Sequence, residues 1–99
     1  MYDNKFIWDE EKHKINIDKH NVSFQEATSV FDDDNAVYFD DELHSETEER
    51  FKVIGFSERI RILMVCHCYR NGDNLIRIIS ARKANKKEIA QYEKGEWLE

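Results

Sequence analysis

The chain has 99 residues, with 15 Lys and Arg against 21 Asp and Glu, 40% apolar residues, two cysteines and no proline. This length fits a single domain over residues 1–99, and the apolar share is too high for a disordered chain. No apolar run reaches the roughly 18 residues of a membrane span, no signal-peptide pattern opens the chain, and Cys66 and Cys68 alone make no disulfide scaffold. We therefore expect a soluble, cytoplasmic protein.

The charges are divided unevenly between the two halves of the chain. Residues 1–49 contain 4 Lys and Arg against 15 Asp and Glu, a net charge of −11, whereas residues 50–99 contain 11 against 6, a net charge of +5. All six arginines lie in the second half. This asymmetry predicts one surface that meets a polyanion or an acidic partner, and another that is acidic and solvated.

The first predicted elements are a short strand and a helix. The strand ends at Phe6-Ile7-Trp8, and Asp9 is a plausible N-cap followed by two glutamates that suit the helix dipole. This helix runs to about His20, because Asn21 tolerates the left-handed backbone of a helix stop.

A second helix begins after Ser23, which forms a capping-box pattern with Glu26. One face of this helix is apolar and carries Phe24, Ala27, Val30 and Phe31. The acidic triplet 32–34 ends it. Three carboxylates could bind a divalent cation, but their spacing resembles no oxygen-cage motif, so we predict a solvated loop and no metal site.

The rest of the chain predicts mainly strands. A short strand over residues 36–39 is followed by an acidic loop over 40–49. Three longer strands come next, at about residues 50–56, 60–69 and 74–82.

The turns between these strands are short, at residues 57–59 and at Asn71-Gly72, the strongest short hairpin signal. Short turns require an antiparallel β-β-β meander. Asn85, with Glu88 three residues later, opens a last helix that ends near Gly95. The order β-α-α-β-β-β-β-α predicts an α+β fold with helices packed on one face of an antiparallel sheet.

Alternation along strand 60–69 separates two sets of side chains. We expect the core on the face with Ile62, Met64, Cys66 and Cys68. The other face carries Arg61, Leu63, Val65, His67 and Tyr69. Cys66, His67 and Cys68 look like metal ligands when read in order. They point to opposite faces, however, and no second cysteine pair completes a tetrahedral site, so we predict no metal there.

Arg77 interrupts the apolar strand 74–82 between Leu75 and Ile79. A guanidinium on an apolar face needs solvent, a carboxylate or a phosphate. Two interpretations stay open: an internal ion pair, to Glu49 or to an acidic helix residue, and phosphate recognition. Alternation places Arg82 in the opposite set of side chains.

Three residues near the first helix also have two interpretations. Lys19 and His20 suit the C-terminal end of a helix dipole, but they could equally take part in catalysis. Trp8 is either a core residue or a stacking surface for a nucleotide base.

The chain resembles the BrnT family of small toxins from bacterial type II toxin–antitoxin systems. The resemblance covers about residues 6–92 and rests on several motifs in the same order: Trp8-Asp9-Glu10, Asn16, Lys19-His20, Val22-Ser23-Phe24, Glu26-Ala27, Glu49-Arg50-Phe51, Ile54-Gly55 and the run from Ile76 to Ala84. Asn21 departs from the glycine that many members carry, although both residues suit a left-handed helix stop.

The resemblance implies a RelE-like fold and a ribonuclease that blocks translation without a metal or another cofactor. It also implies a BrnA-type antitoxin of the ribbon-helix-helix class, bound in a heterotetramer or a larger complex that represses its own operon. Operator DNA would be bound only through the antitoxin.

Carried over by motif, the resemblance implies site residues of two kinds. Arg61, Arg77 and Arg82 would bind the phosphate and its transition state. Glu49 or His67 would transfer the proton, with Lys19 and His20 as further candidates. Lys19, His20, Arg50 and Trp8 would contact the substrate. A non-catalytic module that regulates transcription through a DNA-binding partner is the alternative, and it would have no effect on growth when expressed alone.

Overall fold

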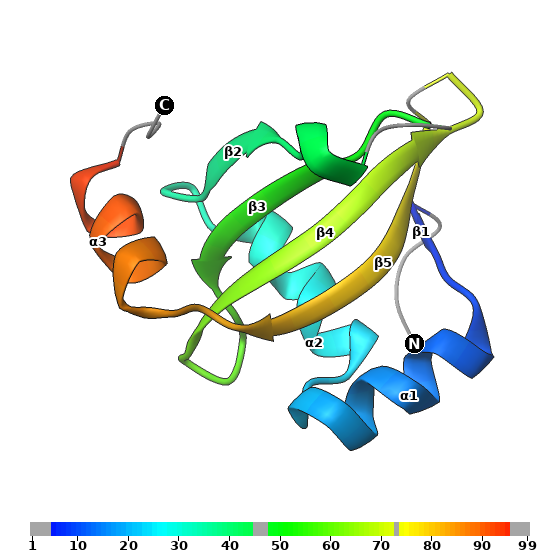
Figure 1. The fold of residues 1–99 in the computed structure, drawn as a ribbon, viewed down its shortest axis with the longest axis horizontal. Coiled ribbons are helices and arrows are strands. Elements are labelled where there is room, and N and C mark those ends of the chain that lie inside the picture. Colours follow the sequence, from blue (N-terminus) through cyan, green and yellow to red (C-terminus); the bar gives the residue numbers. More distant parts are fainter. Residues whose placement is uncertain (1–4, 45–47, 73, 96–99) are drawn as a thin grey trace.

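The computed structural model describes residues 5–44, 48–72 and 74–95 (Figure 1). Its strands form one sheet in the order β1-β5-β4-β3-β2: β1 (Phe6–Ile7), β2 (Val37–Asp40), β3 (Phe51–Phe56), β4 (Ile62–Arg70) and β5 (Leu75–Lys83). Strands β2 to β5 pair antiparallel, which confirms the predicted meander. β1 instead pairs with β5 in parallel. These two strands are distant in sequence and no hairpin joins them, so their connection does not require antiparallel pairing. The sheet is therefore mixed.

The helices are α1 (Glu10–His20), α2 (Phe24–Ser29) and α3 (Lys86–Lys94), with short 3₁₀ turns η1 (Val30–Asp32) and η2 (Glu42–His44). The predicted ends of α1 and α3 are confirmed, whereas α2 ends at Ser29 and the 3₁₀ turn η1 follows it. Asp9 Oδ1 accepts hydrogen bonds from the first turn of α1, and Asn21 ends that helix with a φ of 57°. Asn85 and Glu88 form a complete capping box on α3.

The capping box predicted for α2 forms only by half. Ser23 Oγ accepts the Glu26 N–H at 3.0 Å, as expected. The Glu26 carboxylate does not return to the cap; it accepts hydrogen bonds from Arg61 and Ser57 instead. A contact distant in sequence has taken the side chain that the local motif would use.

The two turns of the meander set the ends of the long strands. Asn71 and Gly72 both have positive φ, 55° and 61°, in the turn between the paired residues Arg70 and Leu75. Ile60 has a φ of 60° and donates its N–H to Ser57 O, so the first turn includes it and β4 begins at Ile62.

The main core lies on the opposite face of β4 from the one that we expected. Leu63, Val65 and His67 are completely buried there, against Phe24, Ala27 and Val30 of α2 and η1. Met64 and Cys68, on the expected core face, are also buried, and Cys66 is partly exposed. The prediction failed because both faces of β4 are largely covered, so polarity along the strand does not identify the side that α2 packs on.

A β-bulge changes the alternation of β5. The pairs are Cys66 with Ser80 and His67 with Ile78, so Ile79 is an extra residue in β5. Ile78 and Ala81, three positions apart, therefore both face the core. As a consequence, Arg77 and Arg82 lie on the same face of the sheet, although simple alternation places them on opposite faces.

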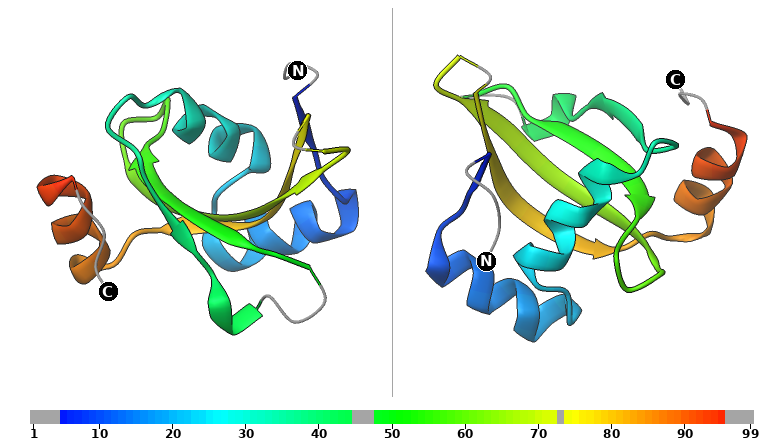
Figure 2. Two further views of the ribbon diagram at one scale, coloured as in Figure 1. Left: turned by 90° about the horizontal axis from the view of Figure 1, so that it is seen from above. Right: turned by 180° about the vertical axis from the view of Figure 1, so that it is seen from behind.

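We had expected all three helices to pack on one face of the sheet, but they do not. α2 covers one face of the curved sheet, and α3 lies at the end of β3 (Figure 2), where the rings of Tyr92 and Phe56 are in contact. α1 lies along β5, where the Asn16 side chain forms hydrogen bonds with both the N–H and the C=O of Ala81. The amide thus pairs with the backbone groups of Ala81 at the edge of β5, as a neighbouring strand would. None of the helices in the described residues has the length and the apolar run that a membrane crossing requires.

Candidate functional site

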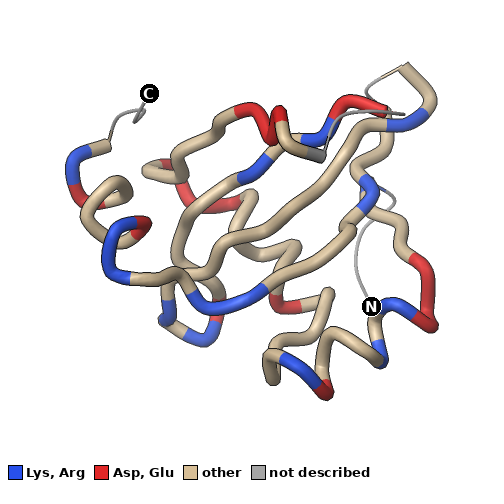
Figure 3. Tube along the Cα trace, in the orientation of Figure 1, with Lys and Arg blue, Asp and Glu red and all other residues tan. Residues whose placement is uncertain are grey.

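The face of β3, β4 and β5 turned away from α2, which we call the open face, carries basic side chains. The cross-strand pairs arrange it in rows: Cys68 with Arg77, then Lys52 with Cys66 and Ser80, then Ile54 with Met64 and Arg82. Each row contains one cation. Figure 3 shows these basic positions on β3 and β5, and acidic positions along the end of β2 and the segment before β3.

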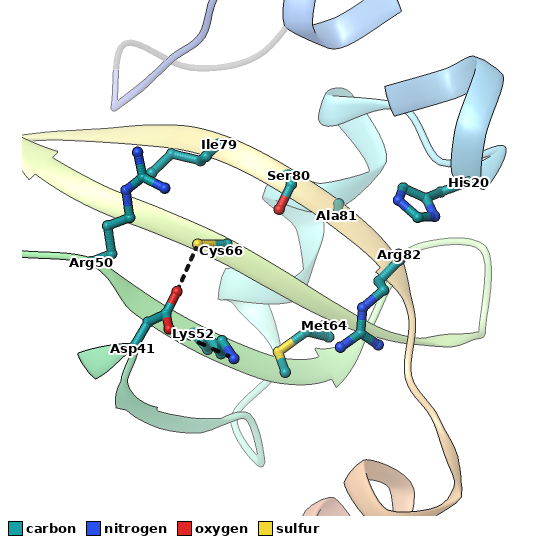
Figure 4. A pocket seen from close by; sticks show the side chains of 10 residues that line it. All are labelled: His20, Asp41, Arg50, Lys52, Met64, Cys66, Ile79, Ser80, Ala81 and Arg82. Carbon is teal, nitrogen blue, oxygen red and sulfur yellow. Dashed lines mark hydrogen bonds and ion pairs between the residues drawn. The ribbon is translucent and has the colours of Figure 1, made fainter. Parts of the chain in front are cut away.

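A pocket of about 320 Å³ opens on this face (Figure 4). Met64, Cys66 and Ser80 line it from the strands, Asp41 from the end of β2, and His20 from the end of α1. Four of its residues are basic or can become so: His20, Arg50, Lys52 and Arg82. In Figure 4, Arg50 and Arg82 stand at opposite ends of the pocket. The fold thus brings His20, from the first half of the chain, to the basic residues of the second half.

Acidic neighbours partly balance this charge. Glu88 of α3 binds Arg82 through two bonds of 2.9 Å, which raises the pKa of the guanidinium. Lys52 Nζ lies 3.8 Å from Asp41 Oδ1, and Glu48 lies between Arg50 and Arg70. Within the described residues, Arg77 has no hydrogen bond or ion pair, so its guanidinium is available to a ligand. Its predicted ion pair to Glu49 is not formed.

Cys66 is not a nucleophile at neutral pH. Its thiol donates a weak hydrogen bond to Asp41 Oδ2 at 3.6 Å. Burial, together with the Asp41 carboxylate, raises its pKa to about 11. The thiol therefore stays protonated, and the reactive thiolate is absent.

Arg61 lies away from the pocket, near the start of α2. Its guanidinium donates to both Glu26 oxygens, at 2.7 and 2.6 Å, and to Asn21 O. Glu26 is only 2% exposed, and the hydrogen bonds from Arg61 lower its pKa. The structure gives Arg61 a carboxylate partner in place of a phosphate.

His67 does not reach the surface, and this burial argues against its predicted role in proton transfer. It is 0% exposed and packs among Phe31, Tyr38, Phe51 and Tyr69. Its Nε2 has no hydrogen-bond partner in the described structure. Burial lowers its pKa from 6.5 to about 4, so His67 is a neutral core residue.

We expect His67 to make stability depend on pH. The unfolded chain binds this proton near pH 6.5 and the folded chain only near pH 4. Stability from the neutral imidazole is therefore complete above about pH 6.5 and falls as the pH drops towards 4, by on the order of 3 kcal/mol. Urea unfolding at several pH values should show this slope, and His67→Leu should remove most of it. An unchanged slope in the variant would place the titration elsewhere.

The other predicted site residues are dispersed. Lys19 and Glu49 are exposed and do not line the pocket. Trp8 packs against the core and His13, but it also lines a second pocket, of about 190 Å³, with Arg70 and Arg77. Both of its predicted interpretations remain compatible with this position.

The acidic triplet has a structural use at its central residue. Asp33 accepts hydrogen bonds from the N–H groups of Phe56 and Asn35 and from the Tyr92 hydroxyl, which joins α3 to the sheet. Burial opposes ionisation of Asp33, but these bonds lower its pKa overall. Among the described residues, no three His, Cys, Asp or Glu side chains are arranged to hold a metal ion.

Sequence reasoning missed Lys52, Asp41 and Ser80 as pocket residues. Lys52 could have been found from its place two residues after Arg50, on the same strand face. Asp41 and Ser80 gave no such signal, because their positions depend on the pairing of β2 with β3 and on the bulge in β5.

Comparison with known proteins finds a family model and a solved structure that are similar to the chain. Residues 8–88 match the family model described as the ribonuclease toxin BrnT of type II toxin–antitoxin systems. Among solved structures, the chain is similar to the ribonuclease toxin BrnT of Brucella abortus, with 26% sequence identity and a TM-score of 0.61, over 82% of this chain and 96% of that one. A comparison with curated proteins finds no match.

Proposed function

The chain belongs to the BrnT family of ribonuclease toxins of type II toxin–antitoxin systems, and we propose that its open face is the surface that binds and cleaves RNA. The observation that carries this proposal is the pocket in which His20 meets Arg50, Lys52 and Arg82. Fixed positive charge stabilises the negative charge that grows on a phosphate during cleavage, and arginine keeps that charge at every working pH.

In this proposal Arg77 and Arg82 bind the phosphate, assisted by Arg50 and Lys52. Arg77 lacks a carboxylate partner in the described structure. Arg82 uses two of its nitrogens on Glu88 and Lys83 O, which leaves its Nε–H for an added oxygen. Arg61 holds Glu26 and serves the fold rather than the phosphate.

His20 transfers the proton in this proposal. Histidine exchanges protons near neutral pH, and His20 is the histidine that lines the pocket. It takes the proton of the ribose 2′-hydroxyl, whose oxygen attacks the phosphorus atom. The bond from phosphorus to the 5′ oxygen breaks, and this oxygen takes a proton from the water in the open pocket. The positive charge of the arginines stabilises the negative charge that develops on the phosphate oxygens in the transition state.

No step in this mechanism requires a metal ion. We expect the purified chain to cleave RNA in excess EDTA at the same rate as in magnesium, since arginine and lysine supply the positive charge. Gel analysis of a labelled RNA with and without EDTA measures this. Activity that disappears with EDTA and returns with magnesium would contradict metal independence. No cleavage under either condition would favour the alternative of a non-catalytic module.

A type II toxin family implies an antitoxin partner. We infer that it is a BrnA-type ribbon-helix-helix protein whose acidic or amphipathic segment occupies the open face in place of RNA. Exposed ion pairs contribute only about 0–1 kcal/mol each, so tight binding also requires apolar burial. Trp8 and Tyr92 are candidates; Trp97, a further candidate by sequence, lies outside the described residues.

We expect this complex to survive gel filtration in about 1 M salt, because apolar burial is not screened by salt. We also expect it to exclude RNA, because the antitoxin segment occupies the open face. Operator binding should need the antitoxin, since the first half of this chain carries a charge of −11. Co-expression followed by operator binding with each component alone measures both points. Dissociation in salt, or operator binding by this chain alone, would contradict the proposal. Translation inhibition, autorepression and a cytoplasmic location are further parts of it.

A further inference from the structure

The Glu88 side chain in the first turn of α3 is fixed in place by the helix that carries it. Its carboxylate accepts the Asn85 N–H at 2.8 Å and completes the capping box of α3. Tyr92, four residues later and so on the same side of the helix, donates its hydroxyl to Asp33 at 2.7 Å and packs its ring on Phe56. Glu88 itself is only 9% exposed. The carboxylate therefore has a defined position relative to the sheet.

This carboxylate binds one edge of the Arg82 guanidinium. Nη1 donates to Glu88 Oε1 and Nη2 donates to Glu88 Oε2, each at 2.9 Å, and Nη1 also donates to Lys83 O at 3.2 Å. A guanidinium has five N–H groups in one plane, and these bonds use three of them. Among the described residues, nothing accepts the other two, the Nε–H and the second N–H of Nη2. These two groups lie side by side on another edge of the plane.

The free edge of Arg82 has the form of a phosphate ligand. Two parallel N–H groups match two oxygens of a phosphate. Arg82 lines one end of the pocket on the open face, and 39% of its side chain is exposed (Figure 4). Glu88 does not line that pocket, so it binds the guanidinium without taking the place of the phosphate. A guanidinium that is already held along one edge loses little further freedom when a phosphate binds.

The charge of Glu88 acts against binding. Burial opposes its ionisation, but the hydrogen bonds from Arg82 and Asn85 lower its pKa overall, so the carboxylate is charged at neutral pH. A negative charge beside Arg82 reduces the attraction of the pocket for any phosphate. Glu88 thus orients the cation at the expense of affinity. A contact of this kind predicts opposite effects on RNA binding and on the rate of the chemical step.

From this geometry we propose that Glu88 is a positioning residue, which orients Arg82 so that its Nε–H and outer Nη2–H donate together to the phosphate under attack. This inference rests on the proposed ribonuclease function and makes α3 a part of the catalytic site. If the ion pair served only to dock α3, its loss would not affect rate and affinity in opposite directions.

The first test is Glu88→Gln, which keeps the size of the side chain and an oxygen for the Asn85 N–H but turns an amide N–H towards Arg82. We expect its single-turnover rate at saturating RNA to fall by about 10–100-fold, because a misplaced catalytic group can cost on the order of 10²-fold. Its affinity for a 2′-O-methyl RNA, which lacks the attacking hydroxyl, should equal or exceed that of the wild type. A wild-type rate, or a loss of affinity together with the rate, would overturn the inference.

The second test adds Arg82→Lys, because lysine has a single nitrogen and no fork to orient. This variant should lower the rate, and Glu88→Gln should lower it no further in the same chain, since the two residues act as one unit. A further loss in the double variant would overturn the inference. A wild-type rate in Arg82→Lys would remove Arg82 from the proposed site, and the inference would fail with it.

Asn85→Ala is the matched control. It removes the other half of the capping box, the bond from the Glu88 N–H to Asn85 Oδ1, and leaves the carboxylate of Glu88 on Arg82. We expect a lower thermal midpoint and a rate close to that of the wild type. A loss of rate equal to that of Glu88→Gln would assign the effect to the stability of α3 and overturn the inference. A wild-type chain that cleaves no RNA would refute the proposed function itself.

Discussion

Replacing His20 with alanine should reduce the rate of RNA cleavage by about 10²–10⁴-fold, the range typical of a general acid or base. His20 lines the pocket at the C-terminal end of α1, and no other histidine among the described residues lines it. The fold should tolerate the change, because the loss of a cation from a helix end costs only about 0.3–1 kcal/mol. Single-turnover cleavage and a thermal melt measure the two effects separately.

The matched control for this experiment is Lys14→Ala, which removes an exposed cation from the same helix. We expect it to leave cleavage and stability close to the wild type. If His20→Ala retains the wild-type rate, the proton-transfer group is another residue.

Arg77→Ala should reduce RNA cleavage by about 10²–10³-fold, the effect of losing one contact to the developing charge. Arg77 is paired with Cys68 across the sheet and has no carboxylate partner in the described residues. Its removal therefore breaks no ion pair in the folded chain, and the thermal midpoint should stay within a few degrees of the wild type. This combination of a large kinetic loss and a small change in stability distinguishes a phosphate ligand from a structural arginine.

Arg61→Ala provides the contrasting case. It leaves the nearly buried Glu26 carboxylate without its guanidinium, so stability should fall in that variant, unlike in Arg77→Ala. A collapse of the thermal midpoint in Arg77→Ala would instead assign Arg77 to the fold. A kinetic loss below about tenfold would give it a peripheral role.

The sequence by itself determined the elements and their ends. Asp9, Asn21, Asn85 and Gly95 act through hydrogen bonds or backbone angles within a few residues, so the helix boundaries follow from local chemistry. The Asn71-Gly72 turn is local in the same sense, and two short turns leave only a meander for β3 to β5. The motifs of the family extend over most of the chain, which is why membership could be inferred before the fold was known.

The tertiary structure decided which side chains meet. The bulge at Ile79 places Arg77 and Arg82 on one face, and the packing of α2 places His67 in the core and Cys66 beside the pocket. The Glu26 carboxylate binds Arg61, 35 residues away in sequence, instead of completing the cap of α2. Such outcomes depend on strand register and on the side of the sheet that a helix covers. Both are set by burial summed over many residues distant in sequence, so no local pattern determines them.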